Sequence, residues 1–146
     1  MKKYILLLGG IVLSVSLLGQ SSVRIEAPPA TERRINKGAF MLLQKGAYSP
    51  NGRYQLALPS DGNLVLNSYR NGSRQVIWSS NTANRQVKYG RFQDDGNFVL
   101  YDVNDRAVWA SNTDGRGAYL AIQNDGNVVI YDANDKAIWS TDTWER

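Results

Sequence analysis

The stretch Asp95-Gly96-Asn97-Phe98-Val99-Leu100 occurs three times in this chain with small changes. The other copies read Asp-Gly-Asn-Leu-Val-Leu at residues 61–66 and Asp-Gly-Asn-Val-Val-Ile at residues 125–130. Asp-Gly between alternating apolar residues is a strong hairpin signal, because glycine accepts the positive φ that a tight turn requires. Each copy therefore predicts a β-hairpin.

A second landmark follows each copy in the same order. It reads Val-Ile-Trp-Ser-Ser-Asn-Thr at residues 76–82, Ala-Val-Trp-Ala-Ser-Asn-Thr at residues 107–113 and Ala-Ile-Trp-Ser-Thr-Asp-Thr at residues 137–143. Two landmarks that recur together indicate a threefold internal repeat. Since one such repeat is too small to bury its apolar face, the sequence predicts an all-β domain in which three sheets pack together.

The period of two along a strand assigns the buried face. One parity carries the residues that we expect in the common interior, namely Leu64, Leu66, Phe98, Leu100, Val128 and Ile130. The three repeated tryptophans, Trp78, Trp109 and Trp139, are expected to meet near a pseudo-threefold axis. Residues 40–43 are expected to form an opening strand.

Composition excludes much chemistry. The chain has 146 residues, which suits one domain, and it contains neither cysteine nor histidine. Disulfides, thiolate nucleophiles, Ser-His-Asp triads and most zinc sites are thereby ruled out. The net charge of +4 falls to +2 without Lys2 and Lys3, and no basic cluster is visible, so nucleic-acid binding is not expected. A binding role is favoured over an enzyme.

The N-terminus has the pattern of a secretory signal. Lys2 and Lys3 precede an apolar run over residues 4–18, and small and polar residues follow. We expect a signal peptide over residues 1–19, a flexible arm over residues 20–34 and the folded domain over residues 35–146. The protein would be secreted or periplasmic, with no membrane span after cleavage; an uncleaved N-terminal anchor is the alternative.

The other face of the hairpins is polar in the second and third repeats, where both read Q-x-D-x-N-x-V-x-Y. The Asp-Gly turn folds the glutamine back beside the strand that carries the asparagine, so that a carboxylate, two amides and a phenol converge around a valine. Fixed donors and acceptors of this kind suit the hydroxyl groups of a sugar. The two candidate sites comprise Gln93, Asp95, Asn97, Val99 and Tyr101, and Gln123, Asp125, Asn127, Val129 and Tyr131.

The first repeat keeps Asp61, Asn63 and Val65 but has Pro59 and Asn67 in place of the glutamine and the tyrosine. We expect it to be a degenerate, structural copy. Turn chemistry alone explains the Asp-Gly-Asn triplet in all three repeats, but it does not explain the glutamine and the tyrosine at identical spacing in two of them.

These motifs resemble the bulb-type (monocot mannose-binding, GNA-related) lectins over about residues 35–143. The resemblance implies a β-prism II fold of three four-stranded antiparallel sheets with pseudo-threefold symmetry, and binding of α-mannose or mannose-containing glycans without metal or cofactor. It implies that Asp95 and Asn97 bind the sugar O2, Gln93 binds O3, Tyr101 binds O4 and Val99 lies against C3–C4. The matching residues of the third repeat would do the same.

Other interpretations remain open. Asp95 and Asp125 as a catalytic acid–base pair are disfavoured, because the repeats place them on different sheets. The loop at residues 132–135 lacks the glycine and the terminal glutamate of a calcium-binding EF-hand. The main alternative is a protein-binding or structural β-prism, or a lectin-like antibacterial protein, with vestigial sugar sites. The resemblance also suggests a homodimer through C-terminal strand exchange, as in the plant relatives.

Overall fold

The computed structural model describes residues 4–8, 11–15 and 30–145, and the chain divides into two compact units, residues 1–30 and 31–146. In the first unit, β1 (Tyr4–Leu8) and β2 (Ile11–Val15) pair as antiparallel strands. Both fall within the predicted signal peptide, whose expected cleavage site after Gly19 lies outside the described residues. In the described part of the chain, no helix is long and apolar enough to cross a membrane.

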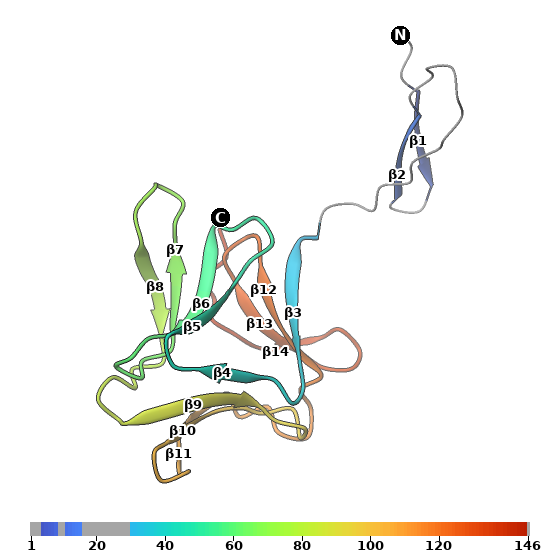
Figure 1. The fold of residues 1–146 in the computed structure, drawn as a ribbon. Coiled ribbons are helices and arrows are strands. Elements are labelled where there is room, and N and C mark those ends of the chain that lie inside the picture. Colours follow the sequence, from blue (N-terminus) through green and yellow to red (C-terminus); the bar gives the residue numbers. More distant parts are fainter. Residues whose placement is uncertain (1–3, 9–10, 16–29, 146) are drawn as a thin grey trace. The chain divides into compact units, whose positions relative to one another are not determined.

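Residues 31–145 form three antiparallel sheets of four strands, one for each repeat, which confirms the predicted β-prism II fold (Figure 1). The first sheet has the order β5 (Lys45–Tyr48), β6 (Tyr54–Leu58), β7 (Val65–Ser68) and β8 (Gln75–Ser79). The second has β4 (Phe40–Leu42), β9 (Val87–Phe92), β10 (Phe98–Asp102) and β11 (Ala107–Ala110). The third has β3 (Glu32–Asn36), β12 (Tyr119–Gln123), β13 (Val128–Tyr131) and β14 (Ala137–Ser140).

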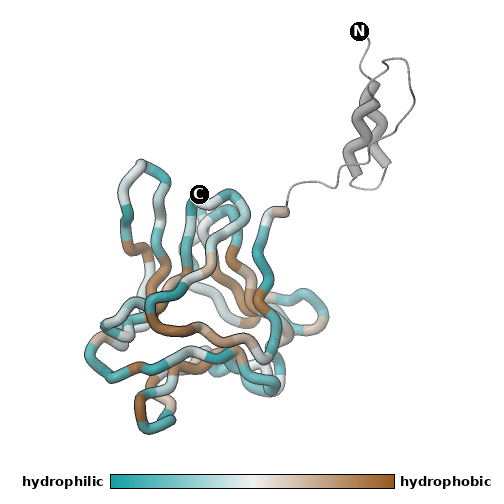
Figure 2. The backbone as a smooth tube through the Cα atoms, viewed as in Figure 1, coloured by the Kyte–Doolittle hydropathy of each residue, from teal (hydrophilic) through white to brown (hydrophobic). Residues whose placement is uncertain are grey.

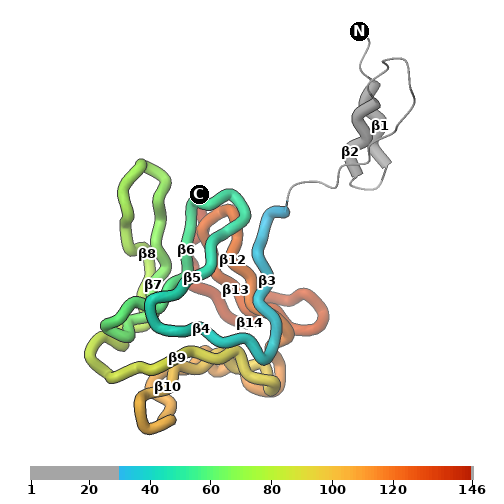
Figure 3. Tube along the Cα trace, in the orientation of Figure 1, coloured from blue at the N-terminus to red at the C-terminus, as the bar shows by residue number. Residues whose placement is uncertain are grey.

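One of the two edge strands of every sheet comes from the N-terminal part of the domain. β3, β4 and β5 follow one another in the chain, yet they pair with β12, β9 and β6, respectively (Figure 3). The opening strand expected at residues 40–43 is therefore present as β4, and it belongs to the sheet of the second repeat. The compact unit begins at Thr31, slightly before the predicted start at Ile35, because β3 is held by β12.

The core lies between the three sheets, and Figure 2 shows apolar residues along the strands and hydrophilic residues at most of the turns. All six residues assigned to the interior are buried: Leu64, Leu66, Phe98, Leu100, Val128 and Ile130. The valines of opposite parity are also buried. Val99, for example, is only 3% exposed. Val99 lies between two neighbouring strands, with Arg91 and Ala110 as its cross-strand partners.

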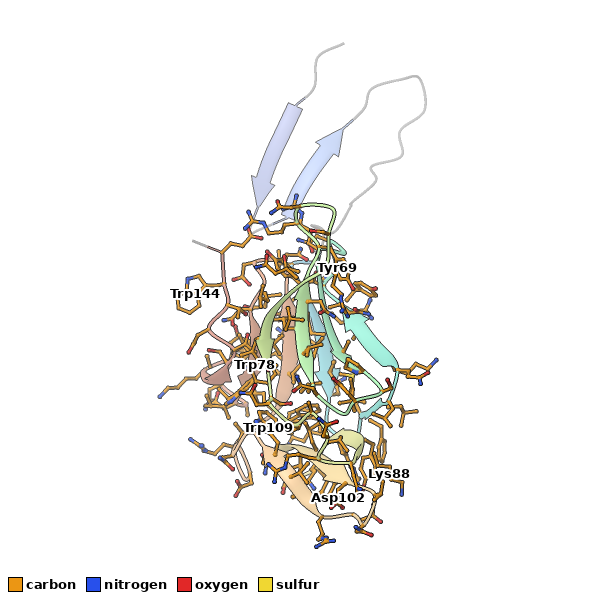
Figure 4. All side chains as sticks on the ribbon, turned by 90° about the vertical axis from the view of Figure 1, so that its left-hand side faces the viewer. Tyr69, Trp78, Lys88, Asp102, Trp109 and Trp144 are labelled. Atoms are coloured by element: carbon orange, nitrogen blue, oxygen red, sulfur yellow. The ribbon has the colours of Figure 1, made fainter. Side chains whose placement is uncertain are left out.

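The three repeated tryptophans meet as expected. Trp78, Trp109 and Trp139 have ring centroids 5.8–5.9 Å apart and interplanar angles of 76–87°, so each ring meets the other two edge to face. They are partly buried and pack against the core, and Figure 4 shows Trp78 and Trp109 next to each other. Each such pair contributes roughly 0.5–1.5 kcal/mol beyond its burial, so the cluster ties the three sheets together.

Candidate functional site

The motif residues of the second repeat lie at one end of the β9–β10 hairpin. Gln93 follows β9, Asp95 and Gly96 form the turn, and Asn97 leads into β10. The backbone N–H of Gln93 donates to the carbonyl of Asn97 over 2.8 Å, so the glutamine does return beside the asparagine. The third repeat has the same closure, with 2.9 Å between Gln123 N and Asn127 O.

Glutamine and tyrosine form a bonded pair in both of these repeats. Gln93 Nε2 donates to the hydroxyl oxygen of Tyr101 over 2.5 Å, and Gln123 Nε2 donates to that of Tyr131 over 2.8 Å. Each tyrosine hydroxyl keeps its proton to donate, and each glutamine keeps its carbonyl oxygen to accept. The structure therefore brings together the two residues that distinguish these repeats from the first one.

One carboxylate oxygen of the motif aspartate stabilises the turn, and the other faces away from that bond. Asp95 Oδ1 accepts the N–H of Asn97 over 2.9 Å, and Asp125 does the same for Asn127. Asp61 makes the matching 3.0 Å bond to Asn63 in the first repeat. Because Oδ1 closes the turn, Oδ2 is the acceptor available to a ligand.

The asparagine side chain is oriented by residues that the sequence analysis gave no role. Asn97 Oδ1 accepts from Ser111 Oγ over 3.0 Å and from the N–H of Thr113 over 3.3 Å. Thr141 and Thr143 hold Asn127 in the same way, and Ser80 and Thr82 hold Asn63. With Oδ1 engaged, each asparagine presents its Nδ2 as the donor. The signal was visible in the sequence, because a hydroxyl residue recurs at both positions after each repeated tryptophan strand.

A second tyrosine supports the motif tyrosine. The rings of Tyr89 and Tyr101 stack with centroids 5.3 Å apart, and those of Tyr119 and Tyr131 stack at 5.2 Å. Tyr119 donates its hydroxyl to Asp135 Oδ1 over 2.8 Å. Burial, and then this bond, raise the pKa of Tyr119 to about 12. Tyr89 and Tyr119 were missed, although they recur at the same spacing as the motif.

The first repeat keeps the turn but not the surface pair. Asn67, in place of the tyrosine, is 1% exposed and donates to Gln55 Oε1 over 3.3 Å. The hydroxyl of Tyr69 donates to the same oxygen over 3.0 Å. The Asn67 amide nitrogen and the Tyr69 hydroxyl are thus both directed at Gln55.

The motif sites of the second and third repeats have different surroundings. In the third repeat, Gln123 and Asp125 line a cavity of about 320 Å³, which Thr31 and Asn124 complete. Glu32 on β3 lies beside it, with 3.5 Å between its Oε2 and Gln123 Nε2, and forms an ion pair with Arg34. The second repeat has Gly38 and Phe40 of the β4 segment at the corresponding edge positions.

Neither motif site has the set of ligating side chains that a metal centre needs. Among the residues that the structure describes, no group of three or more His, Cys, Asp or Glu side chains is placed to hold a metal ion. The motif residues of each site include one carboxylate, and one oxygen of that carboxylate is used in the turn. The arrangement suits direct hydrogen bonding to a ligand rich in hydroxyl groups.

No family model matches the chain, but a known protein and several solved structures are similar to it. The mannose-specific lectin of Aloe arborescens is 36% identical over 84 residues, which are 56% of this chain and 73% of that protein. A monomeric monocot mannose-binding lectin from Gastrodia elata superposes with a TM-score of 0.67 and 36% identity, over 77% of this chain and 98% of that chain.

The mannose-specific agglutinin of snowdrop (Galanthus nivalis), solved with methyl-α-D-mannoside, superposes with a TM-score of 0.57 and 28% identity. The match covers 80% of this chain and all of that one. The repeats, the three-sheet fold and these relatives lead to one conclusion: the chain belongs to the bulb-type lectin family, that of the monocot mannose-binding lectins.

Proposed function

We propose that this protein is a secreted, non-enzymatic lectin that binds α-mannose or mannose-containing glycans through the motif sites of the second and third repeats. The observation that carries the proposal is the bonded glutamine–tyrosine pair beside an oriented aspartate and asparagine, present in these two repeats and absent from the first. The names of the Aloe and snowdrop relatives support mannose as the sugar.

Each site offers a complete set of groups for adjacent sugar hydroxyls. The aspartate Oδ2 accepts, the asparagine Nδ2 donates, and the glutamine–tyrosine pair does both. The family resemblance assigns O2 to the first two groups, O3 to the glutamine and O4 to the tyrosine. Because the valine is almost completely buried, only a small exposed part of its side chain contacts the C–H face of the sugar ring.

A single small site of this kind binds weakly. At about 0.3 kcal/mol per ligand atom, one hexose gives a Kd on the order of millimolar. Two sites on one domain bind a branched glycan more tightly than one sugar, because the second contact is intramolecular.

The aspartates allow a sharp test. Asp95→Asn with Asp125→Asn keeps an oxygen for the turn and replaces the ligand-facing oxygen by an amide. We expect at least a tenfold loss of affinity for methyl α-D-mannoside, since hydrogen bonds to charged groups are among the stronger ones. NMR titration of the backbone amides of both hairpins measures it, and binding should be the same with and without EDTA.

Asp61→Asn in the first repeat is the matched control, because it makes the same turn contact without the glutamine–tyrosine pair. It should leave affinity unchanged. If the double variant binds as well as the unchanged chain, both sites are rejected and the alternative, a structural or protein-binding β-prism, is favoured.

Secretion is a separate part of the proposal. It rests on the charged start, the apolar run and the small residues that follow. N-terminal sequencing of the protein exported by a bacterial host should give Gln20 as the first residue, and an intact Met1 on membrane-bound protein would instead indicate an anchor.

A further inference from the structure

The motif site of the second repeat has an exposed apolar patch beside it. The patch lies on β4, an edge strand of its sheet that runs along β9 (Figure 1). It consists of Phe40 and Leu42, which are 57% and 53% exposed. These residues are two positions apart on one strand, so their side chains point to the same face of the sheet. Exposed apolar side chains that lie together often mark a binding surface.

The register of the sheet connects this patch to the sugar site. Phe40 is the cross-strand partner of Arg91, and Arg91 is the partner of Val99, the motif valine. Cross-strand partners share a face of the sheet, so the three side chains form one row. Two strand spacings of about 4.8 Å put Phe40 roughly 10 Å from Val99. A group attached to a sugar that lies over Val99 can therefore reach Phe40.

The Phe40 ring is held in place by its neighbours. It lies 5.7 Å from the ring of Tyr89, which stacks on the motif residue Tyr101 at 5.3 Å. The guanidinium carbon of Arg91 lies 5.2 Å from the centre of the Phe40 ring, and Arg91 pairs with Asp94 over 3.6 Å. Phe40 thus presents its exposed part from an ordered position, continuous with the sugar site.

The other two repeats carry different residues at the end of the same row. In the third repeat, the row that starts at Val129 ends at Arg34, whose guanidinium pairs with Glu32 over 2.7 Å. In the first repeat, the row that starts at Val65 ends at Gly46, which has no side chain. Of the three rows, that of the second repeat is the one that ends in an apolar side chain.

We propose that the motif site of the second repeat selects mannosides with an apolar aryl or alkyl aglycone, and that Phe40 and Leu42 bind this aglycone. The inference rests on the proposed function. The family resemblance assigns O2, O3 and O4 to the motif residues, so O1, which carries the aglycone, lies outside these contacts. A second sugar suits the patch less well, because two hydrocarbon side chains offer no partners to its hydroxyl groups.

NMR titration of the full chain with methyl and phenyl α-D-mannopyranoside tests the proposal. The amides of residues 95–97 report on the second repeat, and those of residues 125–127 report on the third. We expect the phenyl group to lower the Kd of the second repeat about fivefold to tenfold, the range of one aromatic contact, and to shift the amides of residues 40–42. An equal gain in both repeats, or no response of residues 40–42, would overturn the proposal.

The ratio of the two Kd values at the second repeat isolates the aromatic contact. Phe40→Ala should bring this ratio to about one, and Phe40→Tyr should restore it because the ring is kept. Tyr48→Ala is the matched control, since Tyr48 is an exposed aromatic residue on the edge strand β5 of another sheet. It should keep the ratio of the unchanged chain. A ratio that survives Phe40→Ala would refute the assignment to Phe40.

Two further measurements separate other occupants of the patch. A larger gain with an α-linked mannobiose than with the phenyl mannoside would assign the patch to a second sugar and overturn the apolar aglycone. Shifts of residues 40–42 that depend on protein concentration without sugar would assign it to a second copy of the chain. If neither mannoside binds, the proposed function fails as well, whereas equal binding of both mannosides rejects the aglycone site alone.

Discussion

At the scale of single residues, the asparagine of the motif has two functions that the sequence does not separate. Its Oδ1 holds the segment that follows each repeated tryptophan strand, and its Nδ2 is presented outward. The first function exists in all three repeats, including the one with no glutamine–tyrosine pair. Turn chemistry therefore does account for Asp-Gly-Asn, and it is the glutamine and the tyrosine that distinguish a sugar site from a plain turn.

The first repeat allows the structural function to be measured alone. Asn63→Ala removes the acceptor of Ser80 Oγ and of the Thr82 N–H, and we expect it to lower the free energy of unfolding by about 1–3 kcal/mol. Urea denaturation measures this loss, and methyl α-D-mannoside binding should not change. Asn104→Ala, at an exposed turn position, should stay within about 0.5 kcal/mol. Equal stability of the two variants would contradict the structural role.

At the scale of elements, the hairpin turns depend on glycine for two different reasons. Gly96 has φ +86°, and a Cβ there would lie 2.2 Å from the carbonyl oxygen of Gly117. Gly72, in the β7–β8 loop, has φ +75° and nothing within 4 Å of the same position. The first glycine is required by both conformation and packing, and the second by conformation only.

Alanine substitutions separate these two causes. Gly72→Ala should cost about 1–2 kcal/mol, the price of a left-handed conformation for a residue with a side chain. Gly96→Ala should cost clearly more, about 3 kcal/mol or above, because backbone must also move. Chemical denaturation measures the free energy of unfolding of the two variants. Similar losses of stability would show that the close approach of Gly96 and Gly117 adds nothing to the cost of the Gly96 substitution.

At the scale of the whole molecule, three sheets share one core and one tryptophan cluster, and every sheet is completed by a strand of the same chain. The pairing of β3 with β12 and the contact of Tyr54 with Glu145 join distant parts of the sequence. The domain should therefore unfold as one unit. A homodimer through C-terminal strand exchange stays a prediction.

The composition also sets how stability depends on pH. With no histidine or cysteine, no side chain titrates at its ordinary pKa between about pH 6 and 9, so stability should be flat there. Burial and then the bond to Glu145 raise the pKa of Tyr54 to about 12, and burial and then Asp135 raise that of Tyr119 to about 12. The folded state keeps these protons more tightly than the unfolded state.

The stability that these two tyrosines contribute is thus complete below about pH 10 and is lost as the pH rises through 12. Urea denaturation at a series of pH values measures the decline. Tyr119→Phe should show a smaller loss of stability across this interval than the unchanged chain, and an identical decline would argue against the raised pKa of Tyr119.

The amino-acid sequence is enough to predict the repeats, the hairpins, the buried parity and the ten candidate residues of the two motif sites. These features depend on turn chemistry and on alternation along a strand, which involve neighbours in the chain. The three-dimensional fold was needed to show that β3, β4 and β5 each join a different sheet, that serine and threonine orient the asparagines, and that Arg70 meets Glu145. The latter contacts join residues far apart in the chain, so they depend on how the three sheets pack, and no local pattern encodes that packing.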